Sequence, residues 1–206
     1  MKRFLFVFLA LTMIVSLAAC GGKSGSSSPS DLFTPDPPTL PSESDTPTAP
    51  AAADALELMN AIWAQYGEDD KFPIVGGDFD HNAEDGPGVY SVADGTALDG
   101  DLGLPASVAD KVADAASIRH MMNVNTFTGA AFHIKSADDA QSVADALESN
   151  IQNRQWICGF PDKLTVILAG DYVISAFGSE DLVNTFQANA LAAYDAATVC
   201  YDEAIG

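Results

Sequence analysis

The hydrophobic pattern is clearest in the middle of the chain, where a strand-like stretch is followed by a helix-like one. Aromatic and small apolar residues fill 127–135, which predicts a strand. Across 136–154, apolar residues recur every three or four positions and polar residues take the opposite side, as in an amphipathic helix. Ser136 and Asp139 form an S-x-x-D signal of the kind that starts such helices.

A hairpin is predicted after this helix. Residues 164–169 and 172–177 are two β-branched and aromatic runs, and Gly170-Asp171 between them suits a two-residue type II′ turn. Shorter apolar runs at 72–75 and 89–92 predict edge strands within a segment rich in Gly and Asp.

Helical spacing predicts three further helices. Their ranges are 51–66, 106–118 and 179–202. In the second of them the buried stripe would consist of Val108, Val112 and Ala115. Together these elements predict an α+β fold, in which a small, mainly antiparallel sheet with a strand-helix-hairpin-helix core packs against helices.

The N-terminus carries the features of an export signal. A basic Met1–Arg3 stretch precedes an apolar run at 4–15, which is shorter than the ~20 residues of a spanning helix. Leu17-Ala18-Ala19-Cys20 resembles the lipobox at which bacterial lipoproteins are cleaved and acylated on the new N-terminal cysteine. We therefore expect an extracytoplasmic protein anchored to the cell membrane through a lipidated Cys20. Ordinary secretory cleavage, which would leave Cys20 as a free thiol, is the alternative.

Composition divides the 206 residues into three parts. Residues 1–19 form the lipoprotein signal peptide, and 20–53 form a linker of Ser, Gly, Pro and Thr that has almost nothing to bury and is predicted to be disordered. Residues 54–206 are predicted to form a single domain.

Acidic residues dominate the chain, with 29 Asp and Glu against 9 Lys and Arg. The formal charge of −20 becomes about −22 when Lys2 and Arg3 leave with the signal. This charge excludes nucleic acid as a partner and opposes broad contact with anionic headgroups or wall polyanions. It permits cationic ligands and divalent metals, and it equally suits plain solubility of an exposed domain.

One acidic loop has the alternate oxygen spacing of a calcium site. Asp78, Asp80 and Asn82 would supply its first three ligands. The loop departs from an EF-hand because Ala83 stands where the sharp turn wants Gly and Val89 where a bidentate Glu belongs. The two readings are a less regular calcium site and a solvated acidic loop.

Cysteine usage leaves two alternatives for the domain. Cys158 and Cys200 are an even pair in an exported chain, which makes one disulfide a reasonable prediction. Two buried free thiols are the other prediction. Neither cysteine belongs to a metal motif, because Cys-x-x-Cys is absent and no His lies near either residue in the sequence.

Motifs of catalysis are absent from the sequence, including G-x-S-x-G, H-E-x-x-H, a P-loop and G-x-G-x-x-G. His133 alternates with Phe132 and Ile134, so we expect it on the less buried side of its strand. A non-catalytic binding or accessory module of the cell envelope, with a protein or small ligand as partner, is the favoured function. The enzymatic alternative is an envelope hydrolase that uses carboxylates or His133.

Two apolar sets near the central strand have a structural and a functional explanation. Met121 and Met122 are either flexible core filler or a surface patch suited to a partner peptide. Trp156, Phe160 and Pro161 either rim a pocket or close over the edge of the sheet.

The stretch between His120 and Gly178 resembles a known family in three features. These are the order of its elements, the Met121-Met122-Asn123 approach to the strand, and the Gly170-Asp171-Tyr172-Val173 hairpin. They resemble the small bacterial lipoproteins grouped as domain-of-unknown-function family 4358. The resemblance implies an α+β fold and extracytoplasmic tethering, and it carries over no catalytic residue. The Gly/Asp-rich segment 76–101 is longer here than in the family pattern.

Overall fold

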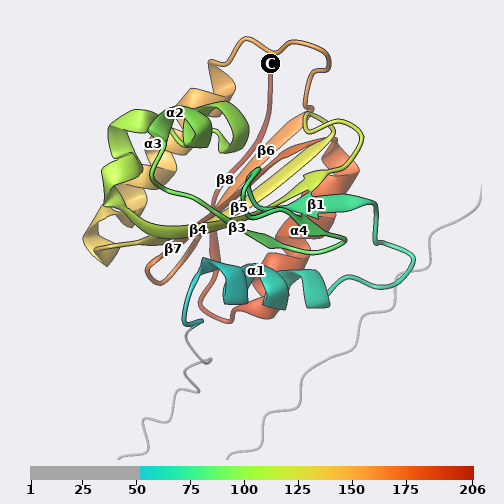
Figure 1. The fold of residues 1–206 in the computed structure, drawn as a ribbon, viewed down its shortest axis with the longest axis horizontal. Coiled ribbons are helices and arrows are strands. Elements are labelled where there is room, and N and C mark those ends of the chain that lie inside the picture. The colour runs from blue at the N-terminus through green and yellow to red at the C-terminus, as the bar shows by residue number, and fades with distance from the viewer. Residues whose placement is uncertain (1–51) are drawn as a thin grey trace, which may run out of the picture. The chain divides into compact units, whose positions relative to one another are not determined.

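The computed structural model describes residues 52–206, so the predicted signal peptide, Cys20 and the predicted linker up to residue 51 lie outside the described residues. The described chain forms one antiparallel sheet of eight strands with helices against both faces (Figure 1). The predicted α+β fold with a mainly antiparallel sheet is confirmed.

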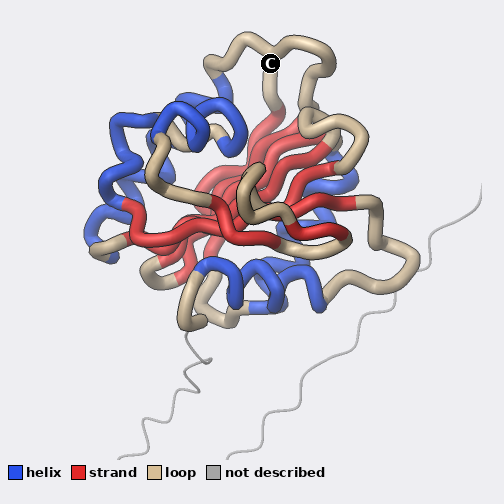
Figure 2. The backbone as a smooth tube through the Cα atoms, in the orientation of Figure 1, coloured by secondary structure: helices blue, strands red, loops and turns tan. Residues whose placement is uncertain are grey.

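The sheet is centred on the strands that the hydrophobic pattern made most prominent. Its order is β2 (Ala83–Glu84), β1 (Ile74–Gly76), β4 (Val112–His120), β5 (Phe127–Ile134), β7 (Tyr172–Gly178), β6 (Lys163–Ala169) and β8 (Thr198–Ala204), with β3 (Gly88–Tyr90) also paired to β4. Figure 2 shows these strands crossing the middle of the molecule. β7 is buried at every position, because both faces of the central sheet are covered.

Helical segments cover the two faces of the sheet. They are α1 (Ala55–Ala64), α2 (Gly95–Ala97), the π-helical turn η1 (Leu98–Leu102), the 3₁₀ turns η2 (Ala106–Lys111) and η3 (Ala137–Asp139), α3 (Ala140–Gln152) and α4 (Glu180–Ala193). α1 and α4 pack on one face, and α3 with η1 packs on the other.

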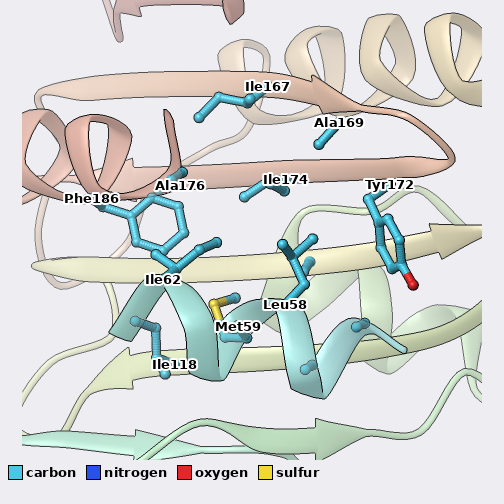
Figure 3. Packing of buried hydrophobic residues seen from close by; sticks show 14 of the residues in the cluster. Leu58, Met59, Ile62, Ile118, Ile167, Ala169, Tyr172, Ile174, Ala176 and Phe186 are labelled. Carbon is cyan, nitrogen blue, oxygen red and sulfur yellow. The ribbon is translucent and has the colours of Figure 1, made fainter. Parts of the chain in front are cut away.

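Two hydrophobic clusters hold these layers together. Leu58, Met59 and Ile62 of α1 are buried against strand residues such as Ile174 and against Phe186 of α4 (Figure 3). On the other face the buried stripe of α3 packs on β5, β6 and β7; its members are Ala140, Val143, Ala144, Leu147 and Ile151. Each large side chain of this kind stabilises the fold by about 1.5–3 kcal/mol.

The central predictions are confirmed as strand β5, helix α3 and the β6–β7 hairpin. Gly170 has φ +66° and Asp171 does not have a positive φ, which fits the predicted type II′ turn. The helical segment begins directly after Ser136, as its start signal predicted, but as the 3₁₀ turn η3 that leads into α3, and the Ser136 side chain makes no capping hydrogen bond. The edge strands predicted at 72–75 and 89–92 correspond to β1 and β3, displaced by one or two residues.

Two predicted helices are wrong over much of their length. Residues 106–118 form only the short η2 turn before β4, and β4 pairs with β5 from Val112↔Ile134 to Arg119↔Thr128. The predicted helix at 179–202 ends with α4 at Ala193, and 198–204 form β8, which pairs with β6. In both places backbone pairing to a neighbouring strand overrides the local helical spacing.

Candidate functional site

An acidic hollow lies beside β3, with a volume of about 350 Å³. Asp78 and Asp80, two of the predicted calcium ligands, line it together with Asp94 and Asp101, which come from α2's cap and from η1. The third predicted ligand, Asn82, lines a neighbouring hollow that shares Asp78 and Asp101. The structure therefore gathers carboxylates from separate loops, which sequence spacing alone does not reveal.

Asp78 is engaged within its own loop. Its Oδ1 accepts hydrogen bonds from the backbone N–H groups of Asp80 at 3.0 Å and His81 at 2.8 Å, and His81 Nδ1 lies 2.8 Å from the same oxygen. Its Oδ2 accepts from the N–H of Ser91 at 2.7 Å. Desolvation acts to raise the pKa of Asp78, but the bonds from Ser91 and His81 outweigh it and lower that pKa. The Asp78 anion thus braces the loop that enters β3.

Asp101 is held from two sides. Its Oδ2 accepts from the Tyr90 hydroxyl at 2.7 Å and from Arg119 Nη1 at 3.2 Å, while Arg119 Nη2 donates to the carbonyl of Gly77 at 2.8 Å. Burial raises the pKa of Tyr90, and the Asp101 carboxylate raises it further. A cation in the hollow would compete with Arg119 for Asp101. Among residues 52–206, no three His, Cys, Asp or Glu side chains stand as a metal-ligand group.

Cys158 and Cys200 are both free thiols, so the structure supports the free-thiol alternative over the disulfide. Cys158 is exposed in the loop between α3 and β6. Cys200 lies at the irregular pairing of β8 with β6, where Gln141 Nε2 donates to its Sγ at 3.3 Å. The thiols differ from the prediction in burial, because one is exposed and the other only half-buried.

His133 sits in a network of charged groups. Its Nδ1 lies 2.8 Å from Asp114 Oδ2, and its Nε2 lies 3.2 Å from Asp171 Oδ2. Its ring stacks on Tyr172 with 4.6 Å between centroids. His133 is more exposed than Phe132 and Ile134, as expected, but the rest of its face of β5, including Phe127 and Ala131, is fully buried. His133 is the partly exposed end of that buried face, next to the start of α1.

The hydrolase alternative needs an activated nucleophile or a free base near a cleft. Both ring nitrogens of His133 face carboxylates, and neither has a Ser, Thr or Cys side chain as a hydrogen-bond partner. His120 stacks on Phe72, and its Nδ1 accepts from the N–H of Met122. These contacts fit structural roles for both histidines.

Exposed apolar side chains gather on two loops at one end of the sheet. Met122, Ile157 and Phe160 are 81%, 78% and 80% exposed, and Met121 and Val124 are also exposed. We call these five residues the apolar tip. Figure 2 shows the loops in tan beyond the ends of the strands. Met121 and Met122 therefore lie on the surface and are not core filler, while their suitability for a partner peptide stays a prediction.

Hydrogen bonds hold the two loops of the apolar tip together. Asn123 Nδ2 donates to the carbonyl of Cys158 at 3.2 Å. Asn125 Nδ2 donates to the carbonyls of Ile157 at 3.0 Å and Gly159 at 3.2 Å. Because these bonds cross between loops far apart in sequence, the tip is a preformed surface.

A hollow of about 440 Å³ continues the tip toward the C-terminus. Trp156, Phe160 and Pro161 line it together with Ile205, and Trp156 also packs on Phe177 of β7 with 5.2 Å between ring centroids. The group therefore both borders a hollow and covers the sheet. The guanidinium of Arg154 lies over the Trp156 ring at 5.3 Å and is held by Asp99. The sequence did not reveal that Asn123 and Asn125 hold the two loops together. Its only hint was the presence of two amide side chains in a short loop.

Within the described residues, no helix combines the length and apolar character needed to cross a bilayer. No family model, curated protein or solved structure matches the chain. The resemblance to the lipoproteins of domain-of-unknown-function family 4358 therefore stays a prediction.

Proposed function

We propose that this protein is a non-catalytic binding module of the cell envelope, anchored through a lipidated Cys20, whose apolar tip docks on a protein partner. The apolar tip carries the proposal, and the signal sequence supports the location. Soluble domains seldom leave large apolar side chains clustered on their surface unless the cluster is a contact site. Met122, Ile157 and Phe160, the most exposed side chains of the tip, would each contribute about 1.5–3 kcal/mol on burial.

The tip is suited to binding because its shape is already set. Cross-loop bonds from Asn123 and Asn125 restrict both loops before any partner arrives. A surface ordered in advance loses less conformational entropy on association. The adjoining hollow beside Trp156 offers room for one apolar side chain of the partner.

Charge argues for a protein with an apolar patch and a basic rim. Residues 121–126 carry no charge, and the loop 153–162 carries one cation, Arg154, and one acid, Asp162. Glu84 and Asp85 share a hollow with Met121, and the chain as a whole has a formal charge of −20. The negative charge around the tip would repel anionic lipid, and a second copy of the chain would carry the same negative charge. Basic side chains around an apolar patch would complement it.

The tip also lies away from the point where the domain receives its N-terminal segment. Tyr172, at the far end of the central strands, binds the carbonyl of Ala52, whereas Phe127 and Gly178 mark the tip end. The eight residues of β5 separate these ends by roughly 25 Å. A domain tethered through its N-terminus is thus free to present the tip to another molecule.

Site-specific photo-crosslinking in the cells that produce the protein tests the proposal. A crosslinker at position 157 of the full chain should capture one discrete protein, and a crosslinker at the exposed but remote position 79 should not. The purified captured protein should then bind the full chain, and Met122→Ser with Phe160→Ser should weaken binding at least about tenfold, while Phe79→Ser leaves it unchanged. Capture of a second copy, or binding to phosphatidylcholine vesicles instead, would contradict a protein partner.

A divalent-cation site in the acidic hollow is the second candidate. The carboxylates of Asp78, Asp80, Asp94 and Asp101 line one hollow. Within residues 52–206 no three of them stand as a metal-ligand group, so a cation would have to draw them together. Ca²⁺ at a hundredfold over its Kd would stabilise the fold by about 2.7 kcal/mol. Asp80→Asn with Asp94→Asn should abolish that gain, whereas a solvated loop would show equal responses to Ca²⁺ and to Mg²⁺ of the same concentration.

A further inference from the structure

Four side chains tie the start of α1 to the sheet. Asp114 Oδ1 accepts from the backbone N–H of Ala55 at 2.8 Å, and the hydroxyl of Tyr172 donates to the carbonyl of Ala52 at 2.8 Å. His133 joins these two, because it contacts the other oxygen of Asp114 and stacks on Tyr172. Asp171, in the β6–β7 turn, contacts the second ring nitrogen of His133. We call Asp114, His133, Asp171 and Tyr172 the His133 clasp.

The two contacts of His133 fit one protonation state better than the other. A neutral imidazole has one N–H and can donate to only one carboxylate, leaving a lone pair facing the other. Only imidazolium can donate from Nδ1 to Asp114 and from Nε2 to Asp171 at the same time. Figure 3 shows Tyr172, the aromatic partner of this ring, beyond Leu58 and near the first turn of α1.

We propose that the His133 clasp makes the attachment of α1's N-terminal end sensitive to protons. With imidazolium in place, Asp114 and Tyr172 are held where they bind residues 52–55. When His133 loses its proton, one carboxylate faces a lone pair and the clasp loosens. The backbone at residues 52–55, through which the domain joins its N-terminal segment, then opens more often, while the sheet stays intact.

The charged groups around the His133 ring decide in which direction its pKa is shifted. Desolvation acts to lower the pKa of His133, but the bonds and charges of Asp114 and Asp171 outweigh it and raise that pKa. Asp54 at the cap of α1 adds a further negative charge near Tyr172, whose pKa is raised to about 12 by burial and these acids, so its hydroxyl stays protonated. Tyr194, from the end of α4, approaches Gly170 in the same turn.

The raised pKa of His133 decides whether the clasp is closed at low or at high pH. The stabilisation is complete below the unfolded-state pKa of His, about 6.5, and is lost as pH rises through the higher pKa of the folded state. The clasp should therefore be closed in mildly acidic surroundings and open in alkaline ones.

Amide hydrogen exchange of the full chain, measured by NMR between pH 6 and pH 9 and corrected for intrinsic exchange, tests the proposal. The protection factor of the Ala55 amide should fall on the order of fivefold as His133 titrates, the factor for one partly exposed hydrogen bond. Amides of β7 should keep their protection. His133→Gln should show the low protection at every pH, and His120→Gln, which alters a histidine outside the clasp, should behave like the unaltered chain.

A second variant keeps the test decisive if His133→Gln fails to fold. Asp171→Asn removes one carboxylate and keeps Asp114, so the fall in Ala55 protection should move to lower pH. The proposal is overturned by a flat Ala55 profile in the unaltered chain. It is equally overturned by an unmoved midpoint in Asp171→Asn, or by a folded His133→Gln chain that keeps the full pH-dependent fall.

Discussion

A single carboxylate, that of Asp78, fixes much of the loop between β1 and β3. It accepts hydrogen bonds from the backbone of Asp80, His81 and Ser91, and therefore joins two ends of a segment that has little regular structure. The sequence marked this residue as a calcium ligand on its spacing. Spacing is shared by cation loops and by loops in which an Asp binds nearby backbone N–H groups, and only the three-dimensional path of the chain separates the two.

Replacement of Asp78 should therefore destabilise the fold without any cation present. Asp78→Ala leaves backbone N–H groups without their acceptor and should lower the free energy of unfolding by about 1–3 kcal/mol in urea titrations. Asp80→Ala, which alters an exposed side chain of the same loop, should change it by less than about 0.5 kcal/mol. Equal effects of the two changes would show that Asp78 does not brace the loop.

The Asp78 carboxylate also makes the free energy of unfolding depend on pH, and its contribution changes with pH in the opposite direction to that of His133. Because the pKa of Asp78 is lowered on folding, its stabilisation is complete above the unfolded value of about 3.9 and is lost as pH falls through the folded pKa. Unfolding free energies measured from pH 6 downward should fall less steeply in Asp78→Ala than in the unaltered chain.

Helices and strands with one regular hydrophobic period were predictable from the sequence. Strands that form because they pair with a strand far away in the sequence were not. α3 has an apolar stripe opposite a polar face, and Gly170-Asp171 identifies the turn of the β6–β7 hairpin. β4 is covered on both faces, so its small apolar residues carry no alternation and also fit a helix. β8 begins only four residues beyond α4, after alanines that favour continuing the helix.

The candidate sites depended even more on pairing between elements. Asp114 and His133 face each other because β4 and β5 pair in one register, and Asp171 joins them through the pairing of β5 with β7. The apolar tip likewise combines a β4–β5 loop with an α3–β6 loop. Strand order and register are not contained in local periodicity, so residue types could be singled out but not brought together.

Close approach of β1 and β3 beside β4 gives an element-scale prediction. A Cβ at Gly76 would lie 2.2 Å from the backbone nitrogen of Gly88 and 2.3 Å from the carbonyl oxygen of Gly86, and backbone atoms have little freedom to move away. Gly76→Ala should therefore separate these strands and lower the free energy of unfolding by about 3 kcal/mol or more. Gly100→Ala is the matched control, because a Cβ there meets nothing within 4 Å. Urea titration of both variants would contradict the packing if Gly76→Ala were as mild as Gly100→Ala.

At the scale of the whole molecule, the excess of acid is the dominant feature. Only 9 Lys and Arg face 29 Asp and Glu, and several of these cations are already engaged, such as Arg119 with Asp101, Arg154 with Asp99 and Lys163 with Asp202. The remaining carboxylates repel one another across the folded surface more strongly than in the expanded unfolded chain. This repulsion opposes close contact between two copies of the chain, and a partner with basic groups around the proposed contact surface would not meet it.

Salt should therefore stabilise this fold. Raising NaCl from 10 to 300 mM shortens the screening length from about 30 Å to less than 8 Å, and should raise the free energy of unfolding by about 1 kcal/mol at pH 7. Urea must be the denaturant, because guanidinium is itself a salt. A variant with the exposed acids Asp69, Asp110 and Asp195 changed to Asn should respond less steeply to the same salt series. Loss of stability with added NaCl, or an unchanged slope in the variant, would mean that the paired cations, rather than the unpaired acids, dominate the electrostatic energy.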